Sequence, residues 1–355
     1  MKISRLRLEN FRGLSNLDLK IDQDFVILVG KNASGKTSFL ESIFYASVLL
    51  GLPPNKSWEL IGFGKNYFRI KVETKEKEFE YYYGRKNEKR YERAQKIDGV
   101  RKKAGEMLGY LPVVVFLPQD LNLLQLSPSL RREYLDDILL QTNKDYEEEL
   151  SSYTKVVSQR NELLYNIRQG SAGLDQLDFW DTKTIELAEK IVRKRKEFSD
   201  YVDQGLSLLY KKVSGQERDL RFYYNNSLGE NPGMYAKKFL EKRQADIASG
   251  RTGAGPHRDD WKIQDSNSFN LAHFLSRGEQ RSIVTCLKRK EVAYLQDGLH
   301  MSPIVLLDEI QAELDEDRRR QVLESLPEDS QIFLTTTNLE ELPEEIVKNA
   351  LVIEL

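Results

Sequence analysis

The feature that most constrains the fold is a glycine-rich loop between an apolar run and an amphipathic one. Residues 30–37 have the sequence GKNASGKT, a full match to the pattern GxxxxGKT. Residues 25–29 before it are apolar, as in a buried strand, and Phe39, Leu40 and Ile43 after it share one face of a helix. In such a loop, backbone amides cradle nucleotide phosphates, while the lysine reaches the β- and γ-phosphates and the threonine holds magnesium. Because both flanks fit, the sequence predicts a nucleotide site, and a chance match is the weak alternative.

A second apolar run, residues 304–307, ends in two acids, Asp308 and Glu309. Two carboxylates at the end of a buried strand are costly unless they serve an ion or a reacting water. We therefore expect Asp308 to act on magnesium, directly or through water, and Glu309 to polarise the attacking water as a general base. A helix N-cap pair is the structural alternative that the spacing leaves open.

Residues 275–281, with the sequence LSRGEQR, precede that strand and open a predicted helix. A serine hydroxyl and glycine amides at a helix N-terminus suit contact with a phosphate, although the string alone is better explained as an N-cap. Together with the two motifs above, it resembles the LSGGE-type signature of ABC ATPases. In that family the signature contacts the γ-phosphate bound to the opposite subunit. The resemblance therefore implies that Ser276 and Gly278 act on ATP held by a second copy of the chain.

Further segments resemble motifs of the ABC ATPases. Gln119, after the apolar residues 113–117, resembles the Q-loop glutamine, and residues 313–315 resemble the D-loop. The histidine that usually follows the next strand is replaced by the threonines at 335–337. The predicted catalytic residues are Glu309, Asp308, Lys36, Gln119 and Ser276, with magnesium contacts from Thr37, Asp308 and Gln119. The predicted ATP contacts are Gly30, Lys31, Asn32, Ala33, Ser34, Gly35, Lys36, Thr37, Ser38, Ser276 and Gly278.

Over nearly its whole length the chain resembles the RecF family of bacterial recombination mediators, which is related to SMC and other ABC-type repair ATPases. The similar segments are LENFR at 8–12, SPSLRR at 127–132, and, most specifically, GPHRDD at 255–260. The resemblance implies an ATP-induced homodimer that clamps DNA at gaps or at single-strand to double-strand junctions, and slow hydrolysis that releases it. It also implies RecR and RecO as partners, and roles in recombinase loading, DNA repair, replication-fork recovery and the SOS response.

The chain also departs from the family pattern. Ala33 stands where the P-loop usually has glycine, Glu279 stands where the signature more often has glutamine, and residues 52–58 replace a basic, histidine-containing segment. These differences favour a divergent orthologue or a specialised paralogue. A module that binds ATP and DNA without cycling, and an SMC-type ATPase of another DNA process, are the alternative functions.

The expected fold class is α/β, with strands at both chain ends and helices between them. We expect an ABC-type P-loop ATPase head with an N-terminal antiparallel β subdomain, formed by residues 1–125 and 215–355. Residues 126–214 have helical spacing, and the GSAG sequence at 170–173 marks a reversal. They predict an inserted arm of short antiparallel helices, each side having about 40 residues and spanning about 60 Å.

Net charge is −2, with 54 basic and 56 acidic residues, so any nucleic-acid site must be a local patch. Residues 85–103 hold nine basic side chains against three acids. Such side chains would bind DNA phosphates without sequence preference, although a solvated hairpin tip is an equal alternative. The candidate DNA contacts are Arg85, Lys86, Lys89, Arg90, Arg93, Arg101, Lys102 and Lys103.

Other sequence features have simpler explanations. The longest apolar runs are far shorter than the roughly 20 residues of a membrane span, and the N-terminus lacks the pattern of a secretory signal, so we expect a cytoplasmic protein without a membrane partner. The single cysteine, Cys286, is expected in the core. The segment from His257 to Asp260 allows a catalytic interpretation, but a satisfied polar cluster is favoured.

Overall fold

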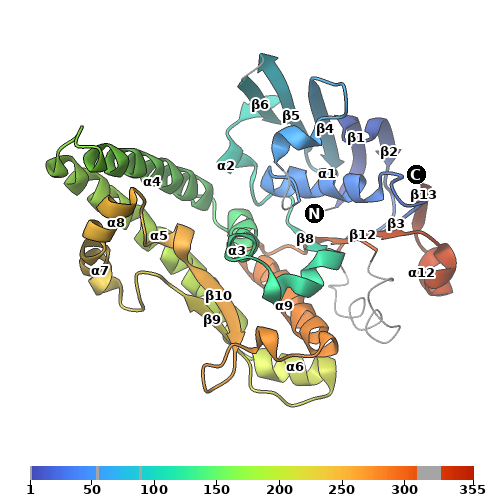
Figure 1. Cartoon of the computed structure of the whole chain (residues 1–355). Coiled ribbons are helices and arrows are strands. Elements are labelled where there is room, and N and C mark those ends of the chain that lie inside the picture. Colours follow the sequence, from blue (N-terminus) through green and yellow to red (C-terminus); the bar gives the residue numbers. More distant parts are fainter. Residues whose placement is uncertain (1, 53–55, 88–89, 310–328) are drawn as a thin grey trace. The chain divides into compact units, whose positions relative to one another are not determined.

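The structure is a computed structural model that describes residues 2–52, 56–87, 90–309 and 329–355 (Figure 1). The chain forms two compact units, Met1–Leu123 with Arg281–Leu355, and Leu124–Gln280. The first unit is thus assembled from both ends of the chain. The predicted residues 313–315 of the D-loop lie outside the described residues.

A parallel sheet forms the centre of the first unit. Among the described residues it has five strands in the order β13-β3-β12-β11-β8, and each pair of neighbours is parallel. The strands are β3 (Phe25–Val29), β8 (Val113–Phe116), β11 (Ile304–Leu307), β12 (Ile332–Thr336) and β13 (Leu351–Glu354). Strands β8 and β11 are buried throughout, as expected of apolar strands covered on both faces. Their carboxyl ends therefore meet at one edge of the sheet, where polar residues can gather.

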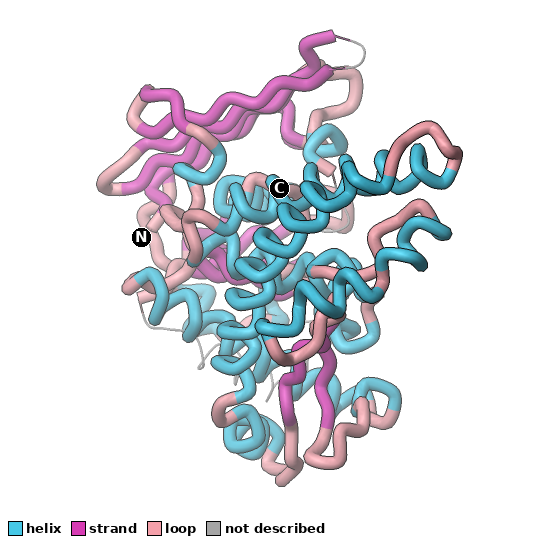
Figure 2. Tube along the Cα trace, turned by 90° about the vertical axis from the view of Figure 1, so that its left-hand side faces the viewer, coloured by secondary structure: helices cyan, strands magenta, loops and turns pink. Residues whose placement is uncertain are grey.

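An antiparallel sheet, with β2, β1, β4, β5, β6 and β7 in that order, completes the first unit. Figure 2 draws its strands in magenta. Its strands are β1 (Ile3–Phe11), β2 (Leu14–Lys20), β4 (Tyr67–Thr74), β5 (Glu78–Asn87), β6 (Arg90–Ile97) and β7 (Val100–Lys102). The alternating residues Phe68, Ile70 and Val72 are buried, as the period of two predicts.

The first unit contains the helix that follows the glycine-rich loop and the later part of the helix that the signature segment opens. Helix α1 (Lys36–Val48) follows the glycine-rich loop and buries Phe39, Leu40 and Ile43, which confirms the predicted face. The later part of α9 (Arg277–Leu299) buries Cys286, and burial raises the pKa of this thiol to about 12. The prediction of a core cysteine is confirmed. The short segments of this unit are η1 (Ser57–Leu60), α2 (Ala104–Met107), η2 (Pro118–Gln125), η7 (Leu339–Glu341) and α12 (Glu344–Lys348).

The second unit is mainly helical, with one antiparallel pair of strands. Its longer elements are α3 (Pro128–Thr142), α4 (Tyr146–Arg168), α5 (Leu177–Asp203), α6 (Leu206–Ser214), β9 (Arg221–Asn225) and β10 (Asp260–Gln264). Its shorter elements are η3 (Leu174–Gln176), η4 (Pro232–Met234), α7 (Tyr235–Glu241), α8 (Arg243–Ser249), η5 (Pro256–Arg258) and η6 (Leu271–His273). The reversal predicted at residues 170–173 joins α4 to α5.

The helices of the arm are shorter than predicted. Helices α4 and α5 have 23 and 27 residues, so each spans about 35 to 40 Å. Each predicted helical tract is interrupted once. Asn143 is extended after α3, and Gly205 adopts a left-handed conformation, with φ 73°, before α6. The apolar spacing continues across both breaks, which is why the sequence suggested two long tracts.

The boundary of the second unit also differs from the expected one. Residues 215–280, expected in the head, belong to the same compact unit as the arm helices. Aromatic contacts account for this grouping, because Phe222 of β9 packs against Phe198 of α5, and Trp261 of β10 packs against Tyr134 of α3. None of the helices in the described part of the chain has the length and apolar character needed to cross a membrane.

Candidate nucleotide-binding site

The glycine-rich loop has close backbone contacts that require its glycines. A Cβ atom on Gly30 would lie 2.4 Å from the backbone oxygen of Leu355, and Gly35 has a φ of 107° at the N-cap of α1. Ala33 also has a positive φ, 67°, which is strained for a residue with a side chain. An open cavity of about 440 Å³ is lined by residues 29–34, Glu354 and Leu355. The cavity adjoins the first part of the loop, and its lining ends one residue before Gly35.

Lys36 is buried at the start of α1, with only 3% of its side chain exposed. Its Nζ donates hydrogen bonds to the backbone oxygens of Gly30 at 2.8 Å and Lys31 at 3.0 Å. The same ammonium group forms an ion pair with Glu309, with Nζ 3.1 Å from Oε1. The structure therefore brings together the predicted phosphate-binding lysine and the predicted general base.

Thr37 and Asp308 also meet, although 271 residues separate them in the chain. The Thr37 hydroxyl donates to Asp308 Oδ2 at 2.9 Å. Burial raises the pKa of Asp308, while hydrogen bonds from Thr335 and Thr37 act in the opposite direction. Hydroxyl and carboxylate oxygens are the ligands that magnesium prefers, so this pair fits the predicted metal contact.

Thr335 is a site residue that sequence reasoning did not assign. Its hydroxyl donates to Asp308 Oδ1 at 2.8 Å and accepts a hydrogen bond from the backbone amide of Glu309 at 2.9 Å. The only sequence signal was the run of threonines in place of a histidine.

Gln119 is exposed at the start of η2, and its role toward magnesium stays a prediction. The neighbouring Asp120 is anchored, because Oδ2 accepts from the Leu117 amide at 2.9 Å and lies 3.4 Å from Lys288 Nζ. Lys288 is buried in α9 and also pairs with Glu291 at 3.1 Å. Burial opposes the charge of Lys288, but Asp120 and Glu291 raise its pKa. This lysine, which the sequence analysis missed, fixes the base of the Q-loop.

The signature segment forms an N-terminal cap. Ser276 donates to Glu279 Oε2 twice, from its amide and from its hydroxyl, both at 2.8 Å, and the Glu279 amide donates to the Ser276 hydroxyl at 3.3 Å. Arg218, another residue that the sequence analysis missed, forms an ion pair with the same carboxylate. Partial burial opposes ionisation of Glu279, but the hydrogen bonds from Ser276 and Arg218 lower its pKa. The N-cap interpretation is confirmed, and the exposed Ser276 remains accessible for a contact in trans.

The segment from His257 to Asp260 is a satisfied polar cluster within the second unit. His257 Nδ1 lies 2.6 Å from the Tyr153 hydroxyl, and its Nε2 lies 3.0 Å from the backbone oxygen of Thr252. Burial lowers the pKa of His257. Asp259 accepts from the Tyr224 hydroxyl and from the Ser227 amide. These contacts favour the structural interpretation over the catalytic one.

The basic segment at residues 85–103 covers the end of β5, β6 and β7. Six of its candidate residues are exposed and Lys102 is half-buried, while Lys89 lies outside the described residues. Arg93 lies over the Tyr83 ring, 5.4 Å from its centroid, and also donates to the Ser57 hydroxyl. Arg93 thus contributes to packing, and the DNA contact stays a prediction. The six exposed residues are Arg85, Lys86, Arg90, Arg93, Arg101 and Lys103.

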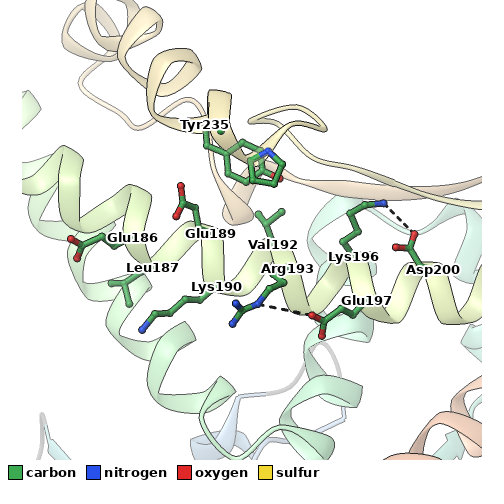
Figure 3. Close-up of a pocket in the computed structure, with 12 residues that line it drawn as sticks. Glu186, Leu187, Glu189, Lys190, Val192, Arg193, Lys196, Glu197, Asp200 and Tyr235 are labelled. Atoms are coloured by element: carbon green, nitrogen blue, oxygen red, sulfur yellow. Dashed lines mark hydrogen bonds and ion pairs between the residues drawn. The ribbon is translucent and has the colours of Figure 1, made fainter.

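A groove of about 1000 Å³ lies along α5, with Tyr235 at its other side (Figure 3). Its lining mixes acids and bases, including the pairs Lys196–Asp200 and Arg193–Glu197. Because these charges largely neutralise one another, the groove shows no preference for a charged ligand. It has no counterpart in the predicted sites.

The parallel sheet, the glycine-rich loop after β3, the acid pair after β11 and the capped signature helix together define a P-loop ATPase head of the ABC type. The family model described as RecF/RecN/SMC N terminal domain matches residues 2–352. The chain belongs to the RecF family. The predicted family and fold class are therefore confirmed.

Individual relatives agree with this assignment. A protein of Agathobacter rectalis named DNA replication and repair protein RecF is 32% identical over 344 residues, which cover 96% of this chain and 93% of the relative. A solved structure of the recombination mediator protein RecF with ATP, in the RecFOR pathway, has a TM-score of 0.87 and 28% identity over 96% of this chain and 93% of that chain. An Smc head bound to a winged-helix domain of ScpA has a TM-score of 0.51 and 17% identity over 100% of this chain and 94% of that chain, and shares the fold alone.

Proposed function

We propose that the chain is an ATP-dependent recombination mediator that grips DNA as a homodimer, in the cytoplasm. The observation that carries the proposal is the convergence of Lys36, Thr37, Asp308 and Glu309 at the carboxyl edge of the parallel sheet. The names of the relatives, which concern DNA replication, repair and an ATP-bound mediator, support the same function.

ATP would bind along the glycine-rich loop, where the cavity beside residues 29–34 leaves room for phosphates. Thr37 and Asp308 would hold magnesium, which supplies positive charge to the β- and γ-phosphates when bound. The ammonium of Lys36, already held by two backbone oxygens, would turn to the phosphates.

Phosphate binding would also free the general base. Lys36 pairs with Glu309 in the structure, and a phosphate is a stronger partner for an ammonium group than one half-exposed carboxylate. Glu309 would then accept a proton from the attacking water. Ser276 of a second copy would donate its hydroxyl to the γ-phosphate, so that ATP joins the two copies.

The dimer would hold DNA through exposed basic residues such as Arg90, Arg101 and Lys103. Contacts to phosphates position a protein on DNA without reading sequence, which suits gaps and single-strand to double-strand junctions. Slow hydrolysis would release the DNA and set the time available for partners of the RecR and RecO type to load a recombinase.

The substitution Glu309→Gln tests whether ATP hydrolysis sets the lifetime of the DNA-bound dimer, which we call the timer. We expect ATP binding to remain, hydrolysis to fall about 100-fold or more, and the ATP-bound dimer on a fluorescent gapped duplex to last longer. Glu345→Gln, at an exposed acid in α12, is the control and should behave as wild type. Equal dimer lifetimes for wild type and Glu309→Gln would contradict the timer and favour a module that binds ATP and DNA without cycling.

A further inference from the structure

Thr335 lies near the carboxyl ends of two neighbouring parallel strands. Leu307, the last residue of β11, pairs with Leu334 of β12, so Asp308, just after β11, and Thr335, the next residue of β12, meet at the same edge of the sheet. The side chain of Thr335 is fully buried. A β-branched residue in a strand has a restricted χ1 angle, so the position of this hydroxyl is well defined.

The hydroxyl of Thr335 contacts both acids, each in a different way. It donates its hydrogen to Asp308 Oδ1 at 2.8 Å, and it accepts the backbone N–H of Glu309 at 2.9 Å. A hydroxyl has one donor hydrogen, and a carboxylate only accepts, so the first bond fixes the orientation that leaves a lone pair for the amide. The side chain thus connects a carboxylate to the backbone of the next residue.

The backbone of Glu309 is strained. It has a φ of 44°, in the left-handed region that residues with side chains rarely adopt. Backbone strain of this kind persists only where surrounding contacts enforce it. The Thr335 hydroxyl holds the amide of this strained residue, while the Glu309 carboxylate reaches Lys36.

We propose that Thr335 is a positioning residue for ATP hydrolysis, which orients the Asp308 carboxylate toward Thr37 and holds Glu309 in its left-handed turn. Its catalytic consequence rests on the proposed function, whereas its effect on the Glu309 backbone does not. Thr335 acts through the two acids, because its hydroxyl is engaged by both.

Three variants test this role. Thr335→Val keeps the shape and removes the hydroxyl, Thr335→Ser keeps the hydroxyl and removes a methyl group, and Thr337→Val makes the same change at an exposed threonine of the same run. The first readout is hydrogen exchange of the Glu309 amide in the nucleotide-free protein, resolved by fragmentation mass spectrometry. The second is steady-state ATP hydrolysis.

For Thr335→Val we expect the Glu309 amide to exchange about tenfold faster and kcat to fall about tenfold, factors on the scale of one hydrogen bond, while KM for ATP stays within about twofold. Thr335→Ser and Thr337→Val should stay close to wild type in both measurements. Normal exchange and normal kcat in Thr335→Val would overturn the proposal, as would a serine variant as impaired as the valine variant.

The exchange measurement separates this proposal from the proposed function. If the wild type hydrolysed no ATP, the proposed function would fail, but faster exchange at Glu309 in Thr335→Val would still support the positioning of the backbone. If Thr335→Val did not fold, the serine variant would decide, since wild-type exchange supports a role of the hydroxyl and accelerated exchange contradicts it.

Discussion

The nucleotide site of the first unit and the buried Arg195 of the second unit both place charge away from water, yet the partners of these charges differ. Arg195 of α5 is buried and bonds through all three guanidinium nitrogens, to Asp136, Tyr146 and the backbone oxygen of Pro256. Burial opposes its charge, but Asp136 raises its pKa well above the usual value. For Asp308, in contrast, burial prevails and the pKa is raised, which disfavours its charged form. A buried charge whose partners are complete stabilises the fold, whereas one with incomplete partners is suited to a ligand.

The largest expected effect of this contrast is on stability. Arg195→Met should lower the free energy of unfolding by about 3 to 5 kcal/mol, because it leaves the Asp136 carboxylate partly buried without its cation. Urea unfolding followed by circular dichroism measures this change. Arg193→Met, two residues away and exposed, should change stability by less than about 0.5 kcal/mol. If both substitutions changed the free energy of unfolding by similarly small amounts, the contrast between Arg195 and the nucleotide site would not hold.

At the nucleotide site, removing the buried charge should stabilise the folded protein, whereas the Arg195 substitution should destabilise it. We expect Asp308→Asn to raise the melting temperature of the nucleotide-free protein at pH 7 while abolishing hydrolysis. The folded-state pKa of Asp308 is raised, so its stability contribution is present below the unfolded pKa and is lost as pH rises through the folded pKa. The advantage of the variant should therefore shrink as pH falls toward about 4.

Calorimetry at several pH values checks this expectation, with Asp22→Asn as the control at an exposed acid. A variant that melts below wild type at pH 7 would show that Asp308 is a structural acid like those of the second unit.

The smallest effect is expected in the glycine-rich loop. Ala33→Gly should stabilise the protein by about 1 kcal/mol, because glycine adopts the observed φ of 67° without steric cost. Ala236→Gly, at an exposed position of α7, should instead destabilise by about 0.5 to 1 kcal/mol, since glycine is a poor helix former. Thermal unfolding measures the stability change of each variant. Destabilisation by Ala33→Gly would contradict the inferred strain in the backbone of Ala33.

The sequence predicted those parts of the molecule that depend on local pattern. We could predict the loop at residues 30–37, the strand before it and the acids after β11. Motifs and hydrophobic periodicity involve residues that are close in sequence, so they can be read without the structure. The strand patterns at the two chain ends also predicted a sheet built from both ends, with the helical arm inserted between them.

The parts that could not be predicted depend on contacts between distant residues. The double role of Thr335, the Lys288–Asp120 pair and the Arg218–Glu279 pair each join segments that no local pattern connects. The length of the arm was overestimated for a related reason, since apolar periodicity continues across the breaks near Asn143 and Gly205.

The central claim, that ATP joins two copies of this chain around DNA, is tested most directly by mass in solution. We would measure the mass of wild type and of Ser276→Arg with and without ATP and magnesium, adding a fluorescent gapped duplex. The account predicts that the wild-type mass doubles only with ATP and that DNA binding tightens, while Ser276→Arg binds ATP and stays monomeric. A wild type that remains a monomer, hydrolyses ATP and ignores DNA would contradict it.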